Sequence, residues 1–484
     1  MKDLALQALD AAARRGVTYA DVRAIEIRDR EITTKNGKAG HVSGSESLGL
    51  GIRVLAFGCW GFAATDDLTP AGIAAAAALA LDIARAGKAA HKRDVVLAPE
   101  GKYEAQWVSP CAIDPFSIPV DRQLAALLAI DEALRRNPGV TLAETSMHFE
   151  RRRQVFASTL GSLIDQTRVQ SGAGFSALSY KNGEIQRRSY PNSFGGQYQL
   201  KGYELIDELH LLENAPRIAE EAVALHAADQ CPEGEFDLIL DSSQLALQIH
   251  ESIGHPIELD RVLGSEANYA GMSFLTLDRL GRLEYGSEIV NVVCDARPVH
   301  GPGLGTFAFD DEGVPAQSND IVRGGLFVGY MTSRETAAAV GAGRSNGCMR
   351  ADGWARLPLI RMTNVSLLPG DQELEEVFDA RSGIYMETNR SWSIDDKRYN
   401  FQFGCEIGWE VRNGKRKRML KNPSYSGIST DFWNSCVAIA GREHWTLWGV
   451  PNCGKGQPEQ VMGTGHGASP ARFRKIKTGG AYGG

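Results

Sequence analysis

The chain has 484 residues, 43% of them hydrophobic and 23% charged, which is typical of a folded globular protein with room for roughly two to four domains. Its net charge of −7 argues against a surface that binds nucleic acid. The eight cysteines include no Cys-x-x-Cys pair, so we expect free, mostly buried thiols in a reducing compartment and no disulfide framework.

The first part of the chain alternates helix-like and strand-like segments. An amphipathic helix is expected over residues 3–15, and Asn36-Gly37 predicts a hairpin turn. Thr69 and Pro70 predict the cap and first residue of a second helix that ends near Gly87. Strand-like segments lie between these helices, at residues 20–28, 30–34, 38–46, 47–57 and 59–64.

No segment of the sequence predicts export or membrane insertion. The apolar, alanine-rich stretch at residues 73–84 is too short to span a bilayer, and no signal peptide is visible. We therefore expect a cytoplasmic protein with no membrane partner.

The middle of the chain predicts a third helix and then antiparallel strands. Ser117 and Pro119 open the helix, and residues 203–228 form a further helical stretch. Residues 140–200 between them read as strands, with turns near 151–153, 161, 172–174 and 182–183.

The run Cys231-Pro232-Glu233-Gly234 is the best candidate for a domain boundary. We predict an α+β domain at residues 1–230, with 1–115 and 116–230 as candidate subregions, and a β-rich domain at 231–484. The fold class is therefore α+β, with a mixed helix and antiparallel-sheet region followed by a barrel-like C-terminal domain.

Two charged runs in the C-terminal half have ordinary structural interpretations. The basic run at residues 415–418 follows Asn413-Gly414 and predicts a solvated strand after a hairpin turn. Residues 310–313, Asp-Asp-Glu-Gly, lack the alternating spacing of a Ca²⁺ loop and predict a turn. The rest of this half is strand-rich, except for a helical stretch at 333–341.

The most informative run is His250-Glu251-Ser-Ile-Gly-His255. A short strand at 236–240 precedes it, Asp241 or Ser242 caps a helix, and that helix carries an apolar stripe of Leu245, Ile249 and Ile253. A carboxylate beside two histidines suits a Zn²⁺ ion held next to a general base.

The spacing of the two histidines is unusual. Five residues on a regular helix leave His250 and His255 about 140° apart, so they share one metal only if the helix distorts or ends between them. Gly254 tolerates a helix end, and Pro256 biases His255 toward extended backbone. We therefore predict a break at Gly254, after which His255 swings back toward the metal.

A third metal ligand is expected, because catalytic zinc usually has three protein ligands. Glu258 and Asp260 are near in sequence and also suit outer partners of the metal. Cys453 lies between turn-forming residues, with Lys455 close enough to favour a thiolate, although the loop by itself favours a partly buried free cysteine in a turn. His466 is either a carbonyl-polarising group or an ordinary loop residue.

The chain as a whole resembles the TldD/PmbA family of metallopeptidases, and its TldD branch in particular. The run from His250 to Asp260 resembles the family's central motif, and Cys453-Gly454-Lys455 resembles its C-terminal block. Further ordered matches lie at residues 19–22, 49–54, 306–315 and 361–364. The spacing after Lys455 and the segment 466–473 depart from the expected form.

The resemblance implies a zinc-dependent peptidase with His250, His255 and Cys453 as ligands and Glu251 as catalytic base. It also implies an unfolded peptide or small protein as substrate and a homodimer or a heterodimer with a related subunit. Residues 345–354 are a candidate peptide contact. The alternatives are a non-catalytic or regulatory subunit and a nucleic-acid regulator, and the acidic composition argues against the second.

Overall fold

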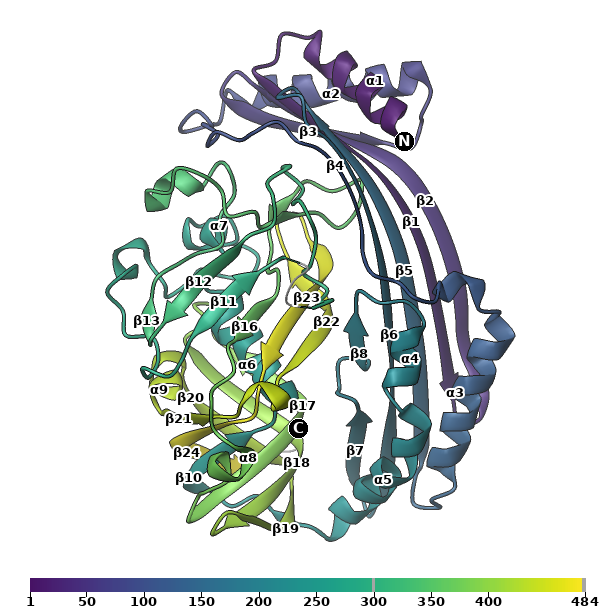
Figure 1. Ribbon diagram of the computed structural model, residues 1–484, viewed down its shortest axis with the longest axis vertical. Helices are drawn as coiled ribbons and strands as arrows, with labels where there is room; N and C mark the ends of the chain where they lie inside the picture. Colours follow the sequence, from purple (N-terminus) through teal and green to yellow (C-terminus); the bar gives the residue numbers. More distant parts are fainter. Residues whose placement is uncertain (298–300, 481–484) are drawn as a thin grey trace.

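Figure 1 shows the computed structural model, which describes residues 1–297 and 301–480. A long curved sheet from the first half of the chain arches along one side of a β-rich C-terminal region. The predicted α+β fold class is confirmed, because helices and antiparallel strands build the first region and a closed barrel lies in the second.

The long sheet has eight strands in the order β3-β2-β1-β5-β6-β4, and β7 and β8 also pair with β6. All neighbours are antiparallel except β4 and β6. The strands are β1 (Tyr19–Lys35), β2 (Lys38–Ala56), β3 (Cys59–Thr65), β4 (Glu104–Val108), β5 (Leu142–Ser158), β6 (Leu163–Lys181), β7 (Glu184–Tyr190) and β8 (Gln197–Gln199).

Several predicted strand breaks are wrong, although the Asn36-Gly37 hairpin is confirmed. The separate strands expected at 20–28 and 30–34 are one continuous strand, β1. Likewise, those expected at 38–46 and 47–57 are the single strand β2. Strands β5 and β6 run straight through the turns predicted near 151–153 and 172–174. Ladder hydrogen bonds on both sides of β1 and β5 override local turn propensity.

Glycines in β2 allow the C-terminal region to approach the sheet. A Cβ on Gly49 would lie 2.3 Å from the Trp354 ring, and one on Gly51 would lie 2.5 Å from the Trp354 carbonyl oxygen. Arg53 on the same strand pairs with Asp21 at 2.6 Å and with Glu312 at 3.1 Å. The predicted turn at 310–313 is therefore part of the contact between the two regions.

Helices cover the sheet in two groups with separate cores. Helices α1 (Lys2–Ala13) and α2 (Pro70–Gly87) pack on β1 to β3, while α3 (Val120–Arg135) and α5 (Leu211–Ala224) pack on β5 to β7. The short helix α4 (Glu204–Glu208) and the 3-10 turns η1 (Pro115–Ser117) and η2 (Leu225–Ala227) complete this half.

Helix α2 begins and ends as predicted, with the Thr69 side chain accepting a hydrogen bond from the Gly72 amide. It is 18 residues long, so the estimate from the central alanine stretch was too short, and by length and composition alone it is able to cross a membrane. One such helix is weak evidence of a membrane span, and a Cβ on Gly61 of β3 would overlap the Ala80 carbonyl of this helix.

The C-terminal region contains a closed barrel of five strands in the order β17-β10-β24-β20-β18, which closes by pairing β18 with β17. This confirms the barrel-like prediction. The strands are β17 (Ser382–Ile394), β10 (Gly234–Leu240), β24 (Ala471–Gly480), β20 (Pro423–Ile428) and β18 (Asn400–Arg412), with β19 (Lys415–Lys421), β9 (Asp229–Gln230) and β21 (Cys436–Ile439) paired at the edges. The basic run lies on exposed β19, as predicted.

Smaller sheets lie beside the barrel. They are formed by β11 (Val292–Asp295), β12 (Ser318–Arg323), β13 (Leu326–Phe327) and β16 (Val365–Leu367), by β14 (Met349–Arg350) with β15 (Leu359–Ile360), and by β22 (Thr446–Lys455) with β23 (Gln460–Ala468). Short helices connect them: α7 (Leu259–Val262), η4 (Leu277–Arg279), η6 (Ala337–Val340), α8 (Leu374–Val377), α9 (Ser429–Asn434) and η7 (Arg442–His444). The helix predicted at 333–341 is only the 3-10 turn η6.

Helix α6 (Ser242–Ile249) follows β10 directly and carries the histidine motif at its end. Asp241 caps it by accepting hydrogen bonds from the amides of Ser243 and Gln244, as predicted. The stripe formed by Leu245, Ile249 and Ile253 is fully buried in the largest core cluster. The packed core therefore fixes the position of the motif. The division of the chain at residue 230 stays a prediction.

Candidate metal centre

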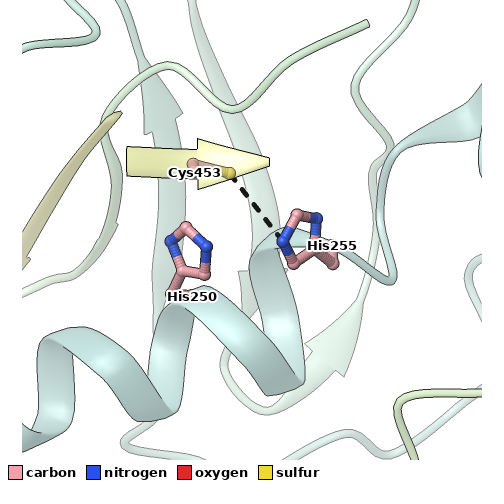
Figure 2. A group of neighbouring side chains, drawn as sticks. All are labelled: His250, His255 and Cys453. Carbon is pink, nitrogen blue, oxygen red and sulfur yellow. Dashed lines mark hydrogen bonds between the residues drawn. The ribbon is translucent and has the colours of Figure 1, made fainter. Parts of the chain in front are cut away.

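The structure brings His250, His255 and Cys453 together. One potential ligand atom from each lies within 4.8 Å of the other two, and all three residues are buried. The sulfur of Cys453 lies 3.8 Å from Nε2 of His255. Figure 2 shows the two imidazoles rising from one helical segment toward the strand that carries the cysteine. Residues separated by about 200 positions thus meet at one point.

A π-helical turn aligns the two histidines. Residues His250–Gly254 form this turn (η3), and the His255 amide donates to the His250 carbonyl at 3.1 Å. A five-residue repeat places the second histidine above the first, which a regular helix does not do. The predicted distortion is present, but the predicted extended backbone at His255 is wrong, because its φ of −66° and ψ of −41° are helical.

Gly254 is the last residue of the helical segment, as predicted, and it also serves close packing. Its φ is not positive, and a Cβ at this position would lie 2.1 Å from the sulfur of Met362. Met362 itself is fully buried in the core. The glycine therefore lets the π-turn pack directly against the core.

His466 fixes the orientation of His250. Nδ1 of His466 lies 2.9 Å from the Val365 carbonyl oxygen, which only accepts, so this nitrogen carries the proton. Burial lowers the pKa of His466 well below its ordinary value, so the ring is neutral and its Nε2 accepts from Nδ1 of His250 at 2.8 Å. The free lone pair of His250 is consequently on Nε2, on the side of the other two residues.

The prediction of His466 as a loop residue is wrong, because it is fully buried in β23. The glycines and threonine around it suggested a loop, and only pairing with β22 makes this segment a strand. Its contact with another histidine left no signal in the sequence.

A carboxylate orients His255 in the corresponding way. Oε2 of Glu258 accepts from Nδ1 of His255 at 3.0 Å, which leaves Nε2 of His255 facing the Cys453 sulfur. Burial also lowers the pKa of both His255 and His250, so both rings are neutral, which is the form that binds metals. The expected outer role of Glu258 therefore matches its position.

Glu258 belongs to a buried charged network. The ammonium of Lys455 lies 3.4 Å from Glu258 and 2.7 Å from Asp260, and Arg261 lies 2.6 Å from Glu266. Oε1 of Glu258 has no hydrogen-bond partner among the described residues. Burial, with Glu258 as a neighbouring charge, raises the pKa of both Asp260 and Glu266. The network thus contains three carboxylates and two cations, so one further positive charge would balance it.

Cys453 is a buried residue of strand β22, and the turn predicted there is wrong. Burial opposes ionisation, yet the nearby Arg361 and His255 lower the pKa of the Cys453 thiol below its ordinary value. Arg361 also donates to the Cys453 carbonyl at 2.5 Å. The positive charge that favours the thiolate therefore comes from Arg361, whereas Lys455 is engaged by Glu258 and Asp260.

Glu251 lies beside this centre and is 6% exposed. Its Oε2 accepts from Arg398 at 2.5 Å, and Arg398 comes from the loop between β17 and β18 with a left-handed φ of 64°. Nothing near the histidine motif in the sequence pointed to this arginine. The contact holds the carboxylate at the edge of the centre.

The donor set fits zinc. Tetrahedral bonds of about 2.0–2.1 Å to nitrogen and about 2.3 Å to sulfur place N and S roughly 3.5 Å apart. The observed Cys453 to His255 separation of 3.8 Å is near this value. Two neutral imidazoles with known lone pairs and one thiol with a lowered pKa complete the set.

Comparison with known proteins agrees with these features. Three domain models match this chain: PmbA/TldA metallopeptidase domain 1 at residues 20–84, the central domain at 113–228 and the C-terminal domain at 233–480. A metalloprotease from Methanothermobacter thermautotrophicus is 28% identical and covers 96% of each chain.

Two further proteins are similar to this chain, one in sequence and one in fold. A zinc metalloprotease TldD homolog from Saccharolobus solfataricus is 28% identical over 51% of this chain and 52% of its own. The fold is also that of TldE from Thermococcus kodakarensis, with a TM-score of 0.75, 15% identity, and coverage of 99% of this chain and 100% of the other.

Proposed function

The chain belongs to the PmbA/TldD metallopeptidase family, and we propose that it hydrolyses peptide bonds with a zinc ion held by His250, His255 and Cys453. The observation that carries this proposal is the convergence of those three side chains within 4.8 Å in a buried site beside Glu251. The name of the zinc metalloprotease TldD homolog supports zinc as the metal.

Each residue has a chemical task in this proposal. Zinc supplies Lewis acidity, which polarises the scissile carbonyl and acidifies a water molecule. Glu251 accepts the proton from the attacking water and transfers it to the leaving amine, a role suited to a carboxylate next to a ligand. Arg398 holds that carboxylate in place, and His466 and Glu258 hold the imidazoles with their lone pairs directed inward.

We also propose that the substrate is an unfolded peptide or small protein, that the protein forms a homodimer or a heterodimer with a related subunit, and that it is cytoplasmic. The alternative of a non-catalytic subunit requires loss of part of the ligand set. This chain keeps all three side chains and the adjacent glutamate. The complete set favours the catalytic proposal.

The test is mass spectrometry of products from an unstructured peptide mixture, with metal analysis of the same preparation. We expect about one zinc per chain and new peptide termini that disappear with a chelator and return with zinc. The variant Glu251→Gln should keep the metal and lose activity about 10²- to 10⁴-fold, the usual contribution of a general base.

The exposed Glu288, in the same half of the chain, provides the matched control. Glu288→Gln should leave both metal and turnover unchanged. Full activity in Glu251→Gln, or unchanged activity in metal-free protein, would overturn the proposed function.

A further inference from the structure

Two arginines lie directly opposite each other on the long sheet. Arg152 on β5 and Arg168 on β6 are register partners, so their side chains share one face. Like charges at directly opposed positions destabilise a sheet. A third arginine, Arg350 of the C-terminal region, lines the same two adjoining cavities as this pair, with volumes of about 130 Å³ and 10 Å³. We call these residues the arginine pocket.

The arginine pocket lacks matching carboxylates. Among the described residues, no ion pair joins any of the three arginines to an acidic side chain, and the side chain of Arg168 makes no hydrogen bond. Arg152 and Arg350 are 5% and 4% exposed, and the Nε of each has no partner. Burying cations without a compensating negative charge is unfavourable, so this arrangement favours a bound anion.

The nearby acids do not remove this imbalance. Glu150 and Asp352 also line the larger cavity, but Asp352 accepts from the Val461 amide. Asp311, beside the smaller cavity, accepts from Gln154 and from the Ala351 amide. None of these acids forms an ion pair with the three guanidiniums. Their hydrogen bonds among the described residues go to neutral carbonyl oxygens, from Arg152 to Ala351 and from Arg350 to Leu304, Met362 and Gly463.

The mutual repulsion of these cations is visible in their ionisation. Burial, together with the neighbouring Arg152, lowers the pKa of Arg168 to about 10. Burial and the nearby charges of Arg168 and Arg361 lower the pKa of Arg350 to about 9. A bound anion would relieve this repulsion, and a guanidinium matches a carboxylate with two parallel hydrogen bonds.

The arginine pocket lies beside β22, the strand that carries Cys453 of the metal centre. Pro451 and Met462 line the larger cavity, Pro451 is two residues from Cys453 on β22, and Met462 is the register partner of Cys453 on β23. An extended peptide bound along this strand pair reaches from the arginine pocket to the region of Cys453 within a few residues, since a strand advances about 3.3 Å per residue.

We propose that the arginine pocket binds a carboxylate of the peptide substrate and so positions the peptide relative to the metal centre. This inference rests on the proposed function. The carboxylate comes from the peptide C-terminus or from an aspartate or glutamate side chain. The segment 345–354, expected to contact peptide, contributes Arg350 and Asp352 to this pocket.

The test measures binding of fluorescent peptides to zinc-loaded protein carrying Glu251→Gln, which needs no turnover. Three peptides share one unstructured sequence: a free C-terminal acid, a C-terminal amide, and the amide with one internal glutamate. We expect at least one of the two carboxylate peptides to bind about tenfold or more tightly than the plain amide. Which of them does so identifies the source of the carboxylate.

Arg168→Gln, added to the same protein, should remove that preference. The side chain of Arg168 makes no hydrogen bond in the described structure, so its replacement removes no side-chain hydrogen bond. Arg187→Gln, on the exposed part of β7 and outside both cavities, is the matched control and should keep the preference.

Equal binding of all three peptides would overturn the proposal, and so would a preference that survives in Arg168→Gln. If Arg168→Gln does not fold, the comparison of the three peptides on the Glu251→Gln protein still tests whether the pocket prefers a carboxylate. A carboxylate preference in a protein whose wild type cleaves nothing would instead overturn the proposed function, and it would show that the arginine pocket binds the carboxylate of a peptide that is not cleaved.

Discussion

The surroundings of the two histidines differ in kind. His250 is backed by a neutral imidazole and a carbonyl, whereas His255 is backed by a carboxylate inside a buried network of charges. Both arrangements direct a lone pair toward Cys453, so both serve orientation. Only the His255 side also carries excess negative charge that a bound cation would offset. Orientation of the imidazole is therefore common to both halves of the site, whereas charge compensation belongs to the His255 half alone.

Removal of Lys455 should have the largest effect. This residue is 1% exposed and is ion-paired with Glu258 and Asp260. Lys455→Met leaves two buried carboxylates without their nearest cation and should lower the free energy of unfolding by about 3–5 kcal/mol. Denaturant unfolding of the metal-free protein measures this directly.

A matched control for that prediction is Lys421→Met, because Lys421 forms a partly exposed ion pair with Glu184 at 2.9 Å. We expect a loss of about 1 kcal/mol or less. Similar losses of unfolding free energy in Lys455→Met and Lys421→Met would show that the stability of the His255 side does not depend on its buried ion pairs.

Glu258→Gln should separate metal affinity from stability. The amide still orients His255 but removes the excess negative charge, so we expect zinc affinity to fall about 100-fold, the upper end for such outer partners. The metal-free protein should be as stable as wild type or more so, because repulsion with Asp260 and Glu266 is relieved. Competition with a chromogenic chelator and unfolding of the metal-free protein test the two parts. A large loss of stability without zinc would contradict the assigned charge balance.

His466 should have a smaller effect confined to geometry. His466→Ala removes the acceptor for Nδ1 of His250, and we expect zinc affinity to fall about tenfold, the lower end of the same range. His466→Gln retains an acceptor and should recover part of the affinity, which a purely space-filling role would not explain. If His466→Ala weakens zinc binding more than Glu258→Gln does, the proposed division between the two sides is wrong.

The site residues illustrate what the sequence signalled and what it did not. The two histidines and the glutamate form a local motif, so spacing alone identified both the candidate site and the need for a distorted helix. The backbone conformation predicted for His255 was wrong. A π-turn and an extended break both bring two histidines five residues apart to the same side, and local propensities do not distinguish them. Arg398 and the partnership of His466 with His250 left no local signal, since each depends on contacts across more than 100 residues.

The sequence by itself determined the elements whose causes are local. The cap at Asp241, the start of α2 at Thr69 and Pro70, the hairpin at Asn36-Gly37 and the buried stripe of α6 all follow from nearest-neighbour chemistry. Only the tertiary structure decided the lengths of β1, β2, β5 and β6, because pairing on both sides outweighs turn propensity. It also decided which distant sulfur meets the histidines and which arginines gather without acidic partners, since burial and charge there are set by segments far apart in the chain.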